Sequence, residues 1–264
     1  MDLDLTGRHA LVTGSTRGIG LATVVELASM GASVVINGRA NAAIDKAIET
    51  VTNKTEGAKP SGVAADLGTA EGCQALIDAV PDLDILVNNM GIYEPKPFEK
   101  IPDEGWESMF SINVMSGVRL SRHYLPLLLK KDWGRIVFIS SESGIFVPPE
   151  MIHYGFSKAA QLAIARGMAE LTRGTGITIN SVLPGPTWVE MQKVRLGERA
   201  EKMGTTVEKL IKQTFEKRRP SSLLQRYASV EEVASMIAYV CSPASSATNG
   251  AALRVDGGIV RSPF

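Results

Sequence analysis

Tyr154 and Lys158 are the two side chains in this sequence whose types and spacing most directly offer chemistry. They stand four residues apart at the start of a long helical pattern, so both lie on one helix face, about one turn from each other. A nearby cation favours the phenolate and lowers the pKa of a tyrosine, which is ordinarily about 10. A tyrosine brought toward neutrality can exchange a proton with a carbonyl or alcohol oxygen. Such a pair is also common as surface packing, so the rest of the chain must decide between the two readings.

The composition is that of an ordinary globular protein of 264 residues and excludes several classes of function. Basic and acidic residues number 28 each, so no net field attracts nucleic acid or an acidic membrane. No apolar run approaches the roughly 18 residues of a membrane helix, and we expect no signal peptide. Two distant cysteines, Cys73 and Cys241, favour a reducing cytoplasm. The three histidines belong to no ligand-spaced cluster, so we expect no metal site.

A glycine-rich turn near the start of the chain predicts a nucleotide-binding unit. The apolar run 9–13, a helical pattern over 21–30 and a second apolar run at 33–36 fit the size of a βαβ unit. Glycines in the turn permit a tight bend and let backbone amides and the helix N-terminus approach a pyrophosphate. We therefore predict cofactor contacts from the turn and the residue that enters it, namely Thr13, Gly14, Ser15, Arg17, Gly18, Ile19 and Gly20.

Two arginines decide which dinucleotide we expect. Proteins that bind NAD place an acidic side chain near the end of the second strand to bind the ribose 2′-hydroxyl, whereas an arginine there suits a 2′-phosphate. No acidic residue occupies positions 37–39, which end in Arg39, and Arg17 in the glycine turn can reach the same phosphate. Either arginine alone could be a solvated surface residue, but together they favour NADP(H) over NAD(H).

The spacing of the glycine turn, Thr-Gly-x-x-x-Gly-x-Gly, together with the Tyr-x-x-x-Lys pair, resembles the short-chain dehydrogenase/reductase family. Further motifs of that family follow in the same order between Thr6 and Gly258. They are Asp66-Leu67, Asn88-Asn89-Met90-Gly91, Asn113, Ser141, Pro184-Gly185 and Val255-Asp256-Gly257-Gly258. The resemblance implies an α/β fold with a single Rossmann domain over residues 1–264 and a doubly wound parallel sheet of about seven strands.

The resemblance also implies roles for individual residues. Ser141 lies 13 residues before Tyr154, as the catalytic serine of the family does, and would donate a hydrogen bond to the substrate oxygen. Asn113 would distort its helix and hold a water in a proton relay to Lys158, which would also bind the nicotinamide ribose beside Tyr154. The other cofactor contacts that the resemblance implies are Asp66, Leu67, Asn88, Gly91, Pro184, Gly185 and Thr187.

Plainer explanations remain open for several of these residues when they are taken one at a time. A serine cluster such as the one around Ser141 is typical of a turn, and an asparagine inside a helix can be a packed polar residue. Asp66 could serve as a helix N-cap. Val189 stands where the family often has a threonine that touches the diphosphate, so that hydroxyl is absent here.

Residues 188–219 resemble the family least. They are helical in pattern and strongly charged, with pairs of Glu and Lys typical of a solvated helix face. Because the segment follows the Pro-Gly turn, we predict that it is a lid over the substrate. Four large apolar residues could line a pocket there, although such residues more often form core; they are Trp188, Met191, Leu210 and Phe215.

The hypothesis is an NADP(H)-dependent oxidoreductase that transfers a hydride between the nicotinamide and a small-molecule carbonyl/alcohol pair. One candidate substrate class is a 3-ketoacyl thioester, because the chain resembles bacterial 3-oxoacyl-carrier-protein reductases. The other is a small ketone or secondary alcohol, sugars included. Glu142 and Glu150 argue against an anionic substrate unless both face solvent. The resemblance further implies a homotetramer.

Two alternatives stand beside the enzyme. One is a non-catalytic sensor or regulator that binds NADP(H) on the same fold, and the other is a structural subunit of a larger assembly. The intact pair of Tyr154 and Lys158 disfavours both, because such proteins often lose one of the two residues.

Overall fold

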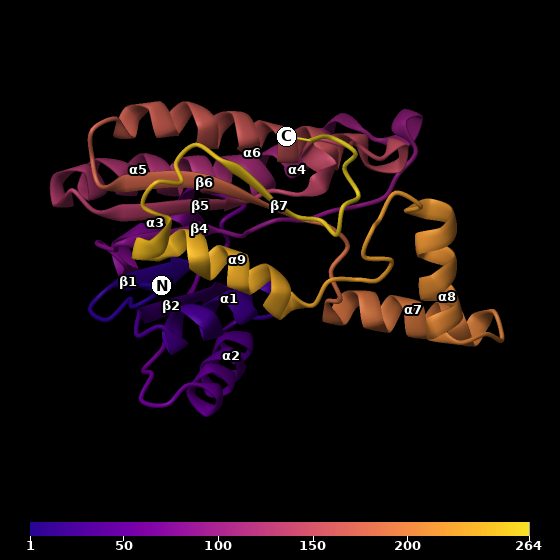
Figure 1. Ribbon diagram of the computed structural model, residues 1–264, viewed down its shortest axis with the longest axis horizontal. Coiled ribbons are helices and arrows are strands. Elements are labelled where there is room, and N and C mark those ends of the chain that lie inside the picture. The colour runs from indigo at the N-terminus through magenta and orange to yellow at the C-terminus, as the bar shows by residue number, and fades with distance from the viewer. Residues whose placement is uncertain (264) are drawn as a thin grey trace.

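The computed structural model describes residues 1–263 and folds them around one seven-stranded sheet in the order β3-β2-β1-β4-β5-β6-β7 (Figure 1). The strands are β1 (His9–Val12), β2 (Ser33–Gly38), β3 (Ser61–Ala64), β4 (Ile85–Asn88), β5 (Gly134–Ile139), β6 (Ile177–Pro184) and β7 (Ala252–Val255). Each pairing is parallel. The strand order reverses between β1 and β4, which creates the switch point where open sheets of this kind bind ligands.

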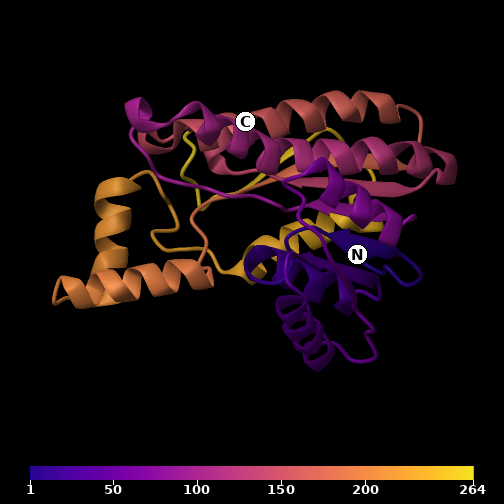
Figure 2. The same ribbon diagram turned by 180° about the vertical axis from the view of Figure 1, so that it is seen from behind.

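Helices cover both faces of the sheet (Figures 1 and 2). They are α1 (Gly18–Ser29), α2 (Asn41–Lys54), α3 (Ala70–Ala79), α4 (Asp103–Phe110), α5 (Ser116–Lys131), α6 (Ile152–Ala169), α7 (Glu190–Lys202), α8 (Val207–Gln213) and α9 (Val230–Cys241). One buried cluster joins the sheet to α1, α2 and α9, and a second joins it to α3, α5 and α6. Burial on both faces explains why the strands read as continuous apolar runs. The predicted doubly wound Rossmann fold is confirmed.

Asn37 fastens the glycine-rich turn to the sheet. Its buried side chain accepts a hydrogen bond from the Gly14 amide at 3.1 Å and donates to two main-chain oxygens at the end of β3. Gly14 and Gly18 have φ values of 58° and 60°, which favour glycine. A Cβ on Gly20 would lie 2.6 Å from the Asn89 side-chain nitrogen, so a larger residue would push α1 away from the turn.

Thr13 joins the turn to the end of β4. Its hydroxyl accepts hydrogen bonds from the backbone amides of Asn89 and Met90, both at 2.9 Å. The Asn89 side chain donates back to the main-chain oxygens of Thr13 and Gly14 at 2.9 and 3.1 Å. These contacts hold the two sides of the switch point together.

Helices α7 and α8 project from the main body beyond the carboxyl ends of the strands (Figures 1 and 2). They pack on each other through a small core of their own, made of Leu196, Ala200 and Leu210 with Trp188, Val207, Ile211 and Tyr227 against it. Phe215 is also buried, whereas Met191 is 48% exposed. Three of the four apolar residues singled out from the sequence, Trp188, Leu210 and Phe215, are therefore packing residues, and Met191 is not.

Three further properties concern the part of the chain that the structure describes. No helix within residues 1–263 is long and apolar enough to cross a membrane. The same residues contain no group of three or more His, Cys, Asp or Glu side chains placed to hold a metal ion. Cys73 and Cys241 are both buried and unbridged.

Candidate active site

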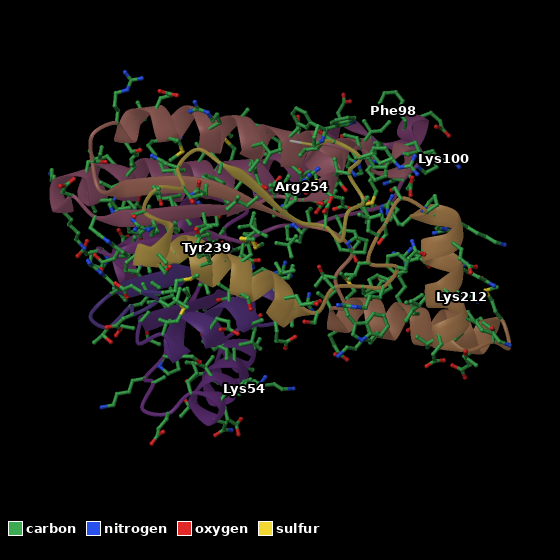
Figure 3. All side chains as sticks on the ribbon, in the orientation of Figure 1. Lys54, Phe98, Lys100, Lys212, Tyr239 and Arg254 are labelled. Atoms are coloured by element: carbon green, nitrogen blue, oxygen red, sulfur yellow. The ribbon has the colours of Figure 1, made fainter. Side chains whose placement is uncertain are left out.

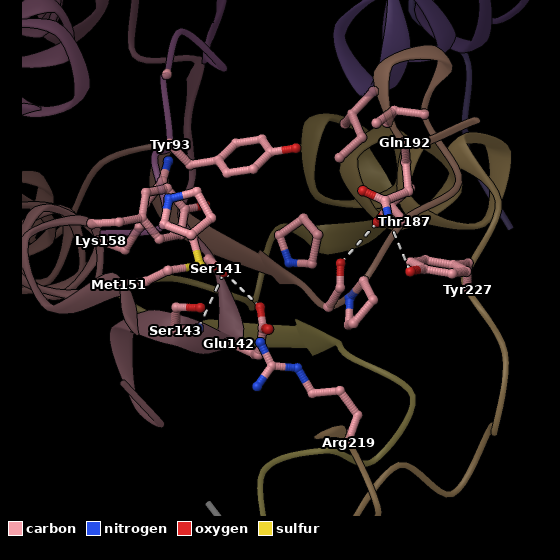
Figure 4. A pocket seen from close by; sticks show the side chains of 18 of the residues that line it. Tyr93, Ser141, Glu142, Ser143, Met151, Lys158, Thr187, Gln192, Arg219 and Tyr227 are labelled. Atoms are coloured by element: carbon pink, nitrogen blue, oxygen red, sulfur yellow. Dashed lines mark hydrogen bonds between the residues drawn. The ribbon is translucent and has the colours of Figure 1, made fainter. Parts of the chain in front are cut away.

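A cavity of about 420 Å³ opens at the carboxyl ends of β4, β5 and β6, beside the switch point. Its wall contains Ser141, Tyr154 and Lys158, the turn that follows β6, and residues of the 188–219 segment. Figure 4 shows Ser141, Glu142 and Lys158 on one side of this space and Thr187, Gln192 and Tyr227 on the other. The tertiary structure thus brings together the three residues predicted to do the chemistry.

Ser141 directly follows the short link from β5. Its hydroxyl oxygen lies 2.6 Å from a carboxyl oxygen of Glu142 and accepts a hydrogen bond from the Ser143 amide at 3.1 Å. The neighbouring Ser140 hydroxyl donates to the main-chain oxygen of Lys158 at 2.8 Å. The Ser140 hydroxyl is therefore engaged in holding β5 to α6, which leaves Ser141 as the candidate for a substrate contact.

Lys158 is buried, and its ammonium has no carboxylate partner among the described residues. Its Nζ donates to the Ile139 main-chain oxygen at 2.8 Å and to the Gln161 side-chain oxygen at 3.2 Å. Burial lowers the pKa of Lys158 to about 7. Nζ lies 5.6 Å from the centroid of the Tyr154 ring, which confirms that the two side chains share one helix face.

The predicted lowering of the Tyr154 pKa is wrong for the structure as it stands. Burial of the phenol raises its pKa above the ordinary value, and the nearby Glu142 carboxyl raises it further. A hydrogen bond with Ser141 acts in the opposite direction without offsetting these effects. Lys158 does not reverse the shift, because burial drives this lysine toward its neutral form. Tyr154 is therefore held as a neutral phenol, the form that can donate a proton.

Asn113 lies in a π-helical segment, Ser111–Met115, between α4 and α5. The expected distortion of this helix is thus confirmed, and such single-turn bulges are frequent at functional sites. The Asn113 side chain accepts a hydrogen bond from the Ile92 amide at 2.8 Å and donates to the Ile92 carbonyl and the Ser157 hydroxyl, both at 2.9 Å. These contacts anchor the loop after β4 to α6.

Gln161 is the residue that the sequence analysis missed. Its buried side chain donates to the main-chain oxygen of Asn113 at 2.6 Å and accepts from Lys158 Nζ at 3.2 Å. A side-chain amide thus joins the main chain of Asn113 to Lys158, and the water relay between these two residues stays a prediction. The available signal was a polar residue three positions after Lys158, on the same helix face. A polar residue on a buried face needs partners.

Apart from three glycines of the turn and the exposed Arg17, Arg39 and Asp66, the predicted cofactor contacts divide into two groups. Those that line the cavity with Tyr154 and Lys158 are Ile19, Gly91, Pro184, Gly185 and Thr187. The side chains of the second group already form hydrogen bonds or core contacts within the protein, so only the backbone of these residues can face a cofactor. Thr13 and Ser15 donate to main-chain oxygens, Leu67 belongs to the core, and Asn88 donates to Ser121 of α5 at 3.1 Å.

The Asn88 side chain therefore faces the fold, so its predicted cofactor contact would have to come from the backbone. Side chains alternate in direction along a strand, and β4 turns Asn88 onto the face covered by α5. The next residue, Asn89, lines the cavity. Asp66 is exposed and closes a turn by accepting from the Gly68 amide at 3.0 Å, whereas Thr69 caps α3.

Arg17 and Arg39 are both exposed and lie at the same edge of the sheet. A Cβ on Gly38 would meet the Thr16 side chain at 2.5 Å, so the glycine turn and the end of β2 are in contact. Thr16 directly precedes Arg17, and Gly38 directly precedes Arg39, so this contact brings the two arginines near each other. Neither arginine forms an ion pair within residues 1–263. Both guanidinium groups are thus available to an anion at this edge.

The residues at this edge fit a nicotinamide dinucleotide. Arg17 precedes α1 without a side-chain cap, so the first helix amides remain available to a pyrophosphate. The close approach at Gly20 and the left-handed backbone at Gly14 and Gly18 would be lost with larger residues. Val189 lies 3.6 Å from the Cβ position of Gly18 and contributes an apolar contact, where a threonine would add a hydroxyl.

Comparison with known proteins gives one consistent picture. The family model for short chain dehydrogenase matches residues 8–199. The oxidoreductase YvaG of Bacillus subtilis (strain 168) is 46% identical over 264 residues and covers all of both chains. The 3-oxoacyl-[acyl-carrier-protein] reductase FabG of Aquifex aeolicus (strain VF5) is 32% identical over 263 residues, covering 98% of this chain and 100% of that protein.

Among solved structures, the L-sorbose reductase of Gluconobacter frateurii, complexed with NADPH and L-sorbose, has a TM-score of 0.93 to this chain. The two sequences are 27% identical, and the match covers 99% of this chain and 100% of the other. The similarity therefore includes the 188–219 segment.

Replacing Gln161 should change the pKa of Lys158 in a direction that depends on the new side chain. Gln161→Leu should lower it below about 7, because the ammonium loses an acceptor at 3.2 Å. Gln161→Glu should raise it, because a carboxylate would replace the amide. NMR titration of the lysine side-chain resonances measures the pKa, with Lys158→Met to identify the signal. Equal values in all three proteins would contradict the link.

Proposed function

This chain belongs to the short chain dehydrogenase family of oxidoreductases, and we propose that it transfers a hydride between NADP(H) and the carbonyl or secondary alcohol of a small molecule. The observation that carries the proposal is the convergence of Ser141, Tyr154 and Lys158 on one cavity at the switch point of the sheet. A bound nicotinamide would supply or accept the hydride, and the protein would orient it.

In the direction of reduction, Tyr154 is the proton donor to the substrate oxygen. Its phenol is neutral, because burial raises the pKa, and it therefore carries the proton that the reaction needs. Ser141 donates a hydrogen bond to the same oxygen and stabilises the charge that develops there. Lys158, held by Ile139 and Gln161, would bind the nicotinamide ribose and favour the phenolate that remains after transfer. In oxidation the same groups act in reverse.

We propose NADP(H) as the cofactor on the basis of Arg17 and Arg39. Both are exposed, lie at one edge and lack protein ion-pair partners in the described residues. A 2′-phosphate would accept charged hydrogen bonds from both. The structurally similar L-sorbose reductase was solved with NADPH, which agrees with this choice.

The cavity wall favours a small polyhydroxylated ketone or alcohol over a long acyl thioester. Beyond the three catalytic candidates and apolar residues such as Ile92, Met151 and Val189, its wall contains seven charged or amide side chains, namely Glu142, Glu150, Gln192, Arg195, Arg199, Arg218 and Arg219. Such groups would hydrogen-bond sugar hydroxyls. The four arginines also outnumber the two carboxylates, so Glu142 and Glu150 do not argue against an anionic substrate as the sequence alone did. L-sorbose in the similar reductase is of this chemical class.

Residues 188–219 would act as a lid over that substrate. The segment projects from the body, has its own small core, and contributes four arginines to the cavity wall. It is tied to the main body at Gln192, whose side chain donates to the Tyr227 hydroxyl at 2.9 Å. Amide hydrogen exchange that slows in this segment when NADPH and substrate are added would support closure, whereas unchanged exchange would contradict it.

The homotetramer is also a proposal, and an exposed aromatic patch supports it. Phe98, Phe110 and Phe156 are 59%, 41% and 46% exposed, and they contact one another through Trp106 or by stacking. Figure 3 shows Phe98 at the margin of the molecule. A contiguous apolar patch on α4 and α6 fits a surface covered by a second copy. Sedimentation equilibrium measures the mass, and a monomer would contradict the proposal.

Tyr154→Phe should lower kcat by about a hundredfold or more, because general acid catalysis contributes about 10² to 10⁴, while NADPH binding stays nearly unchanged. Tyr93→Phe is the matched control, since its ring lies 6.1 Å from that of Tyr154 in the same cavity and should keep most activity. NADPH absorbance with ketoses, sugar acids and ketoacyl thioesters follows turnover, and fluorescence follows binding. Full activity of Tyr154→Phe would contradict the assignment.

The wild-type protein in the same assay also tests the non-catalytic alternative. Binding of NADPH without turnover of any carbonyl would favour a sensor. Turnover of a ketoacyl thioester in preference to every sugar would reverse the choice of substrate class and leave the hydride transfer intact.

Replacing Arg17 and Arg39 by Gln should reduce the preference for NADPH over NADH. Each charged hydrogen bond contributes about 1.5–3 kcal/mol, so kcat/KM for NADPH should fall about tenfold or more per arginine, with little change for NADH. Arg173→Gln is the control, because this arginine is exposed and follows α6 at the opposite edge of the sheet. A wild-type preference for NADH would defeat the proposal.

A further inference from the structure

Glu142 is a buried carboxyl group in the cavity to which the mechanism above gives no part in the proton transfer. It begins the short 3₁₀ turn Glu142–Gly144 after β5 and is only 6% exposed. One of its carboxyl oxygens lies 2.6 Å from the Ser141 hydroxyl oxygen. Figure 4 shows the pair at the cavity wall, with Arg219 extending toward Glu142 from the other side.

The direction of the hydrogen bond between Ser141 and Glu142 decides whether Ser141 has a proton to donate to a substrate. A serine hydroxyl has one proton to donate, and an ionised carboxylate can only accept. If Glu142 were ionised, Ser141 would give its proton to Glu142 and present only lone pairs to a substrate carbonyl. If Glu142 is protonated, its own O–H can donate to Ser141, and the serine proton is free for the substrate. The separation of 2.6 Å suits either direction.

The surroundings of Glu142 favour the protonated form. Burial raises its pKa. The hydrogen bond with Ser141, the positive charge of Arg219 and hydrogen bonds from the backbone amides of Ser143 and Glu142 offset this only in part. Arg219 forms no ion pair with it within the described residues. The titratable groups of α6 in this cavity are Tyr154 and Lys158, and β6 has no titratable side chain. The other charged groups in the cavity wall are Glu150, Arg195, Arg199 and Arg218. A buried carboxylate without a close cation is costly, so the group keeps its proton instead.

We propose that Glu142 is a positioning residue for Ser141: as a carboxylic acid it donates its proton to the serine oxygen and thereby turns the serine hydroxyl hydrogen toward the substrate oxygen. The inference rests on the proposed function, which gives Ser141 its substrate contact. The two hydrogen bonds, from Glu142 to Ser141 and from Ser141 to substrate, run in the same direction and strengthen each other. The Ser143 amide completes the set by donating to the serine oxygen at 3.1 Å.

The first test compares two replacements of Glu142. Glu142→Gln keeps a donor toward Ser141 and should retain most of kcat. Glu142→Leu has no donor and should lower kcat for reduction by about tenfold to a hundredfold, somewhat less than loss of a whole oxyanion donor, with KM and NADPH binding changed far less. Equal losses in both variants would overturn the proposal, because the amide would then have failed to replace the acid.

The pH profile separates positioning from mere packing. The acid form exists below the raised pKa of Glu142, so the wild-type reduction rate should fall as pH rises through that value. Glu142→Gln should lack this fall, although Tyr154 and Lys158 titrate in both proteins. Arg219→Gln removes the nearby cation, raises the pKa of Glu142 further, and should move the fall to higher pH. A fall that persists unchanged in Glu142→Gln would overturn the proposal.

A second readout does not depend on turnover. The infrared difference spectrum between the wild-type protein and Glu142→Gln, with ¹³C-labelled glutamate to confirm the band, should show a protonated carboxylic acid at neutral pH. A carboxylate band instead would overturn the inference while leaving Tyr154 and the proposed function intact. Conversely, full activity in Tyr154→Phe would defeat the proposed function without altering the infrared result.

Discussion

Burial of the Lys158 amine without a carboxylate partner is the constraint on which the rest of the site depends. A buried polar group is costly unless it is hydrogen-bonded, and here the two partners of the amine connect it to three elements. The end of β5 supplies the Ile139 carbonyl, α6 supplies Gln161, and Gln161 in turn binds the main-chain oxygen of Asn113. The π-helical turn at Asn113 and the position of α6 over the strand ends are thus parts of one hydrogen-bonded arrangement.

The same cavity holds two ionisable groups that burial drives toward neutrality from opposite directions. Burial lowers the pKa of Lys158 to about 7 and raises the pKa of Glu142. Tyr154 shares the cavity wall with both and keeps its proton. Environments that shift the pKa values of neighbouring groups are how one fold assigns acid and base roles. A low-dielectric cavity also strengthens each hydrogen bond to a substrate oxygen.

The 188–219 segment supplies the four arginines of the cavity wall. Its helices bury their apolar residues against each other and leave four arginines facing the cavity. The positive charge in the substrate cavity therefore comes from a segment that projects from the main body. Leu196 belongs to both regions, since it packs in the small core of the segment and also lines the cavity.

The sequence by itself determined the fold, the order of its strands and helices, and the constellation of Ser141, Tyr154 and Lys158. Local rules predicted the strands, the nucleotide-binding turn and the Tyr154–Lys158 pair, through continuous apolar runs, glycines where the backbone requires them and a four-residue spacing on one helix. The seven-stranded sheet and the choice of Ser141 came from the resemblance to the short-chain dehydrogenase/reductase family. Only the tertiary structure decided which groups are buried together. It raised the Tyr154 pKa where a pairwise argument with Lys158 had lowered it, and it turned Asn88 away from the cavity. It also placed Gln161 between Asn113 and Lys158, and Glu142 against Ser141. Desolvation and hydrogen-bond partnership depend on residues far apart in the chain, so no spacing along the sequence could reveal them.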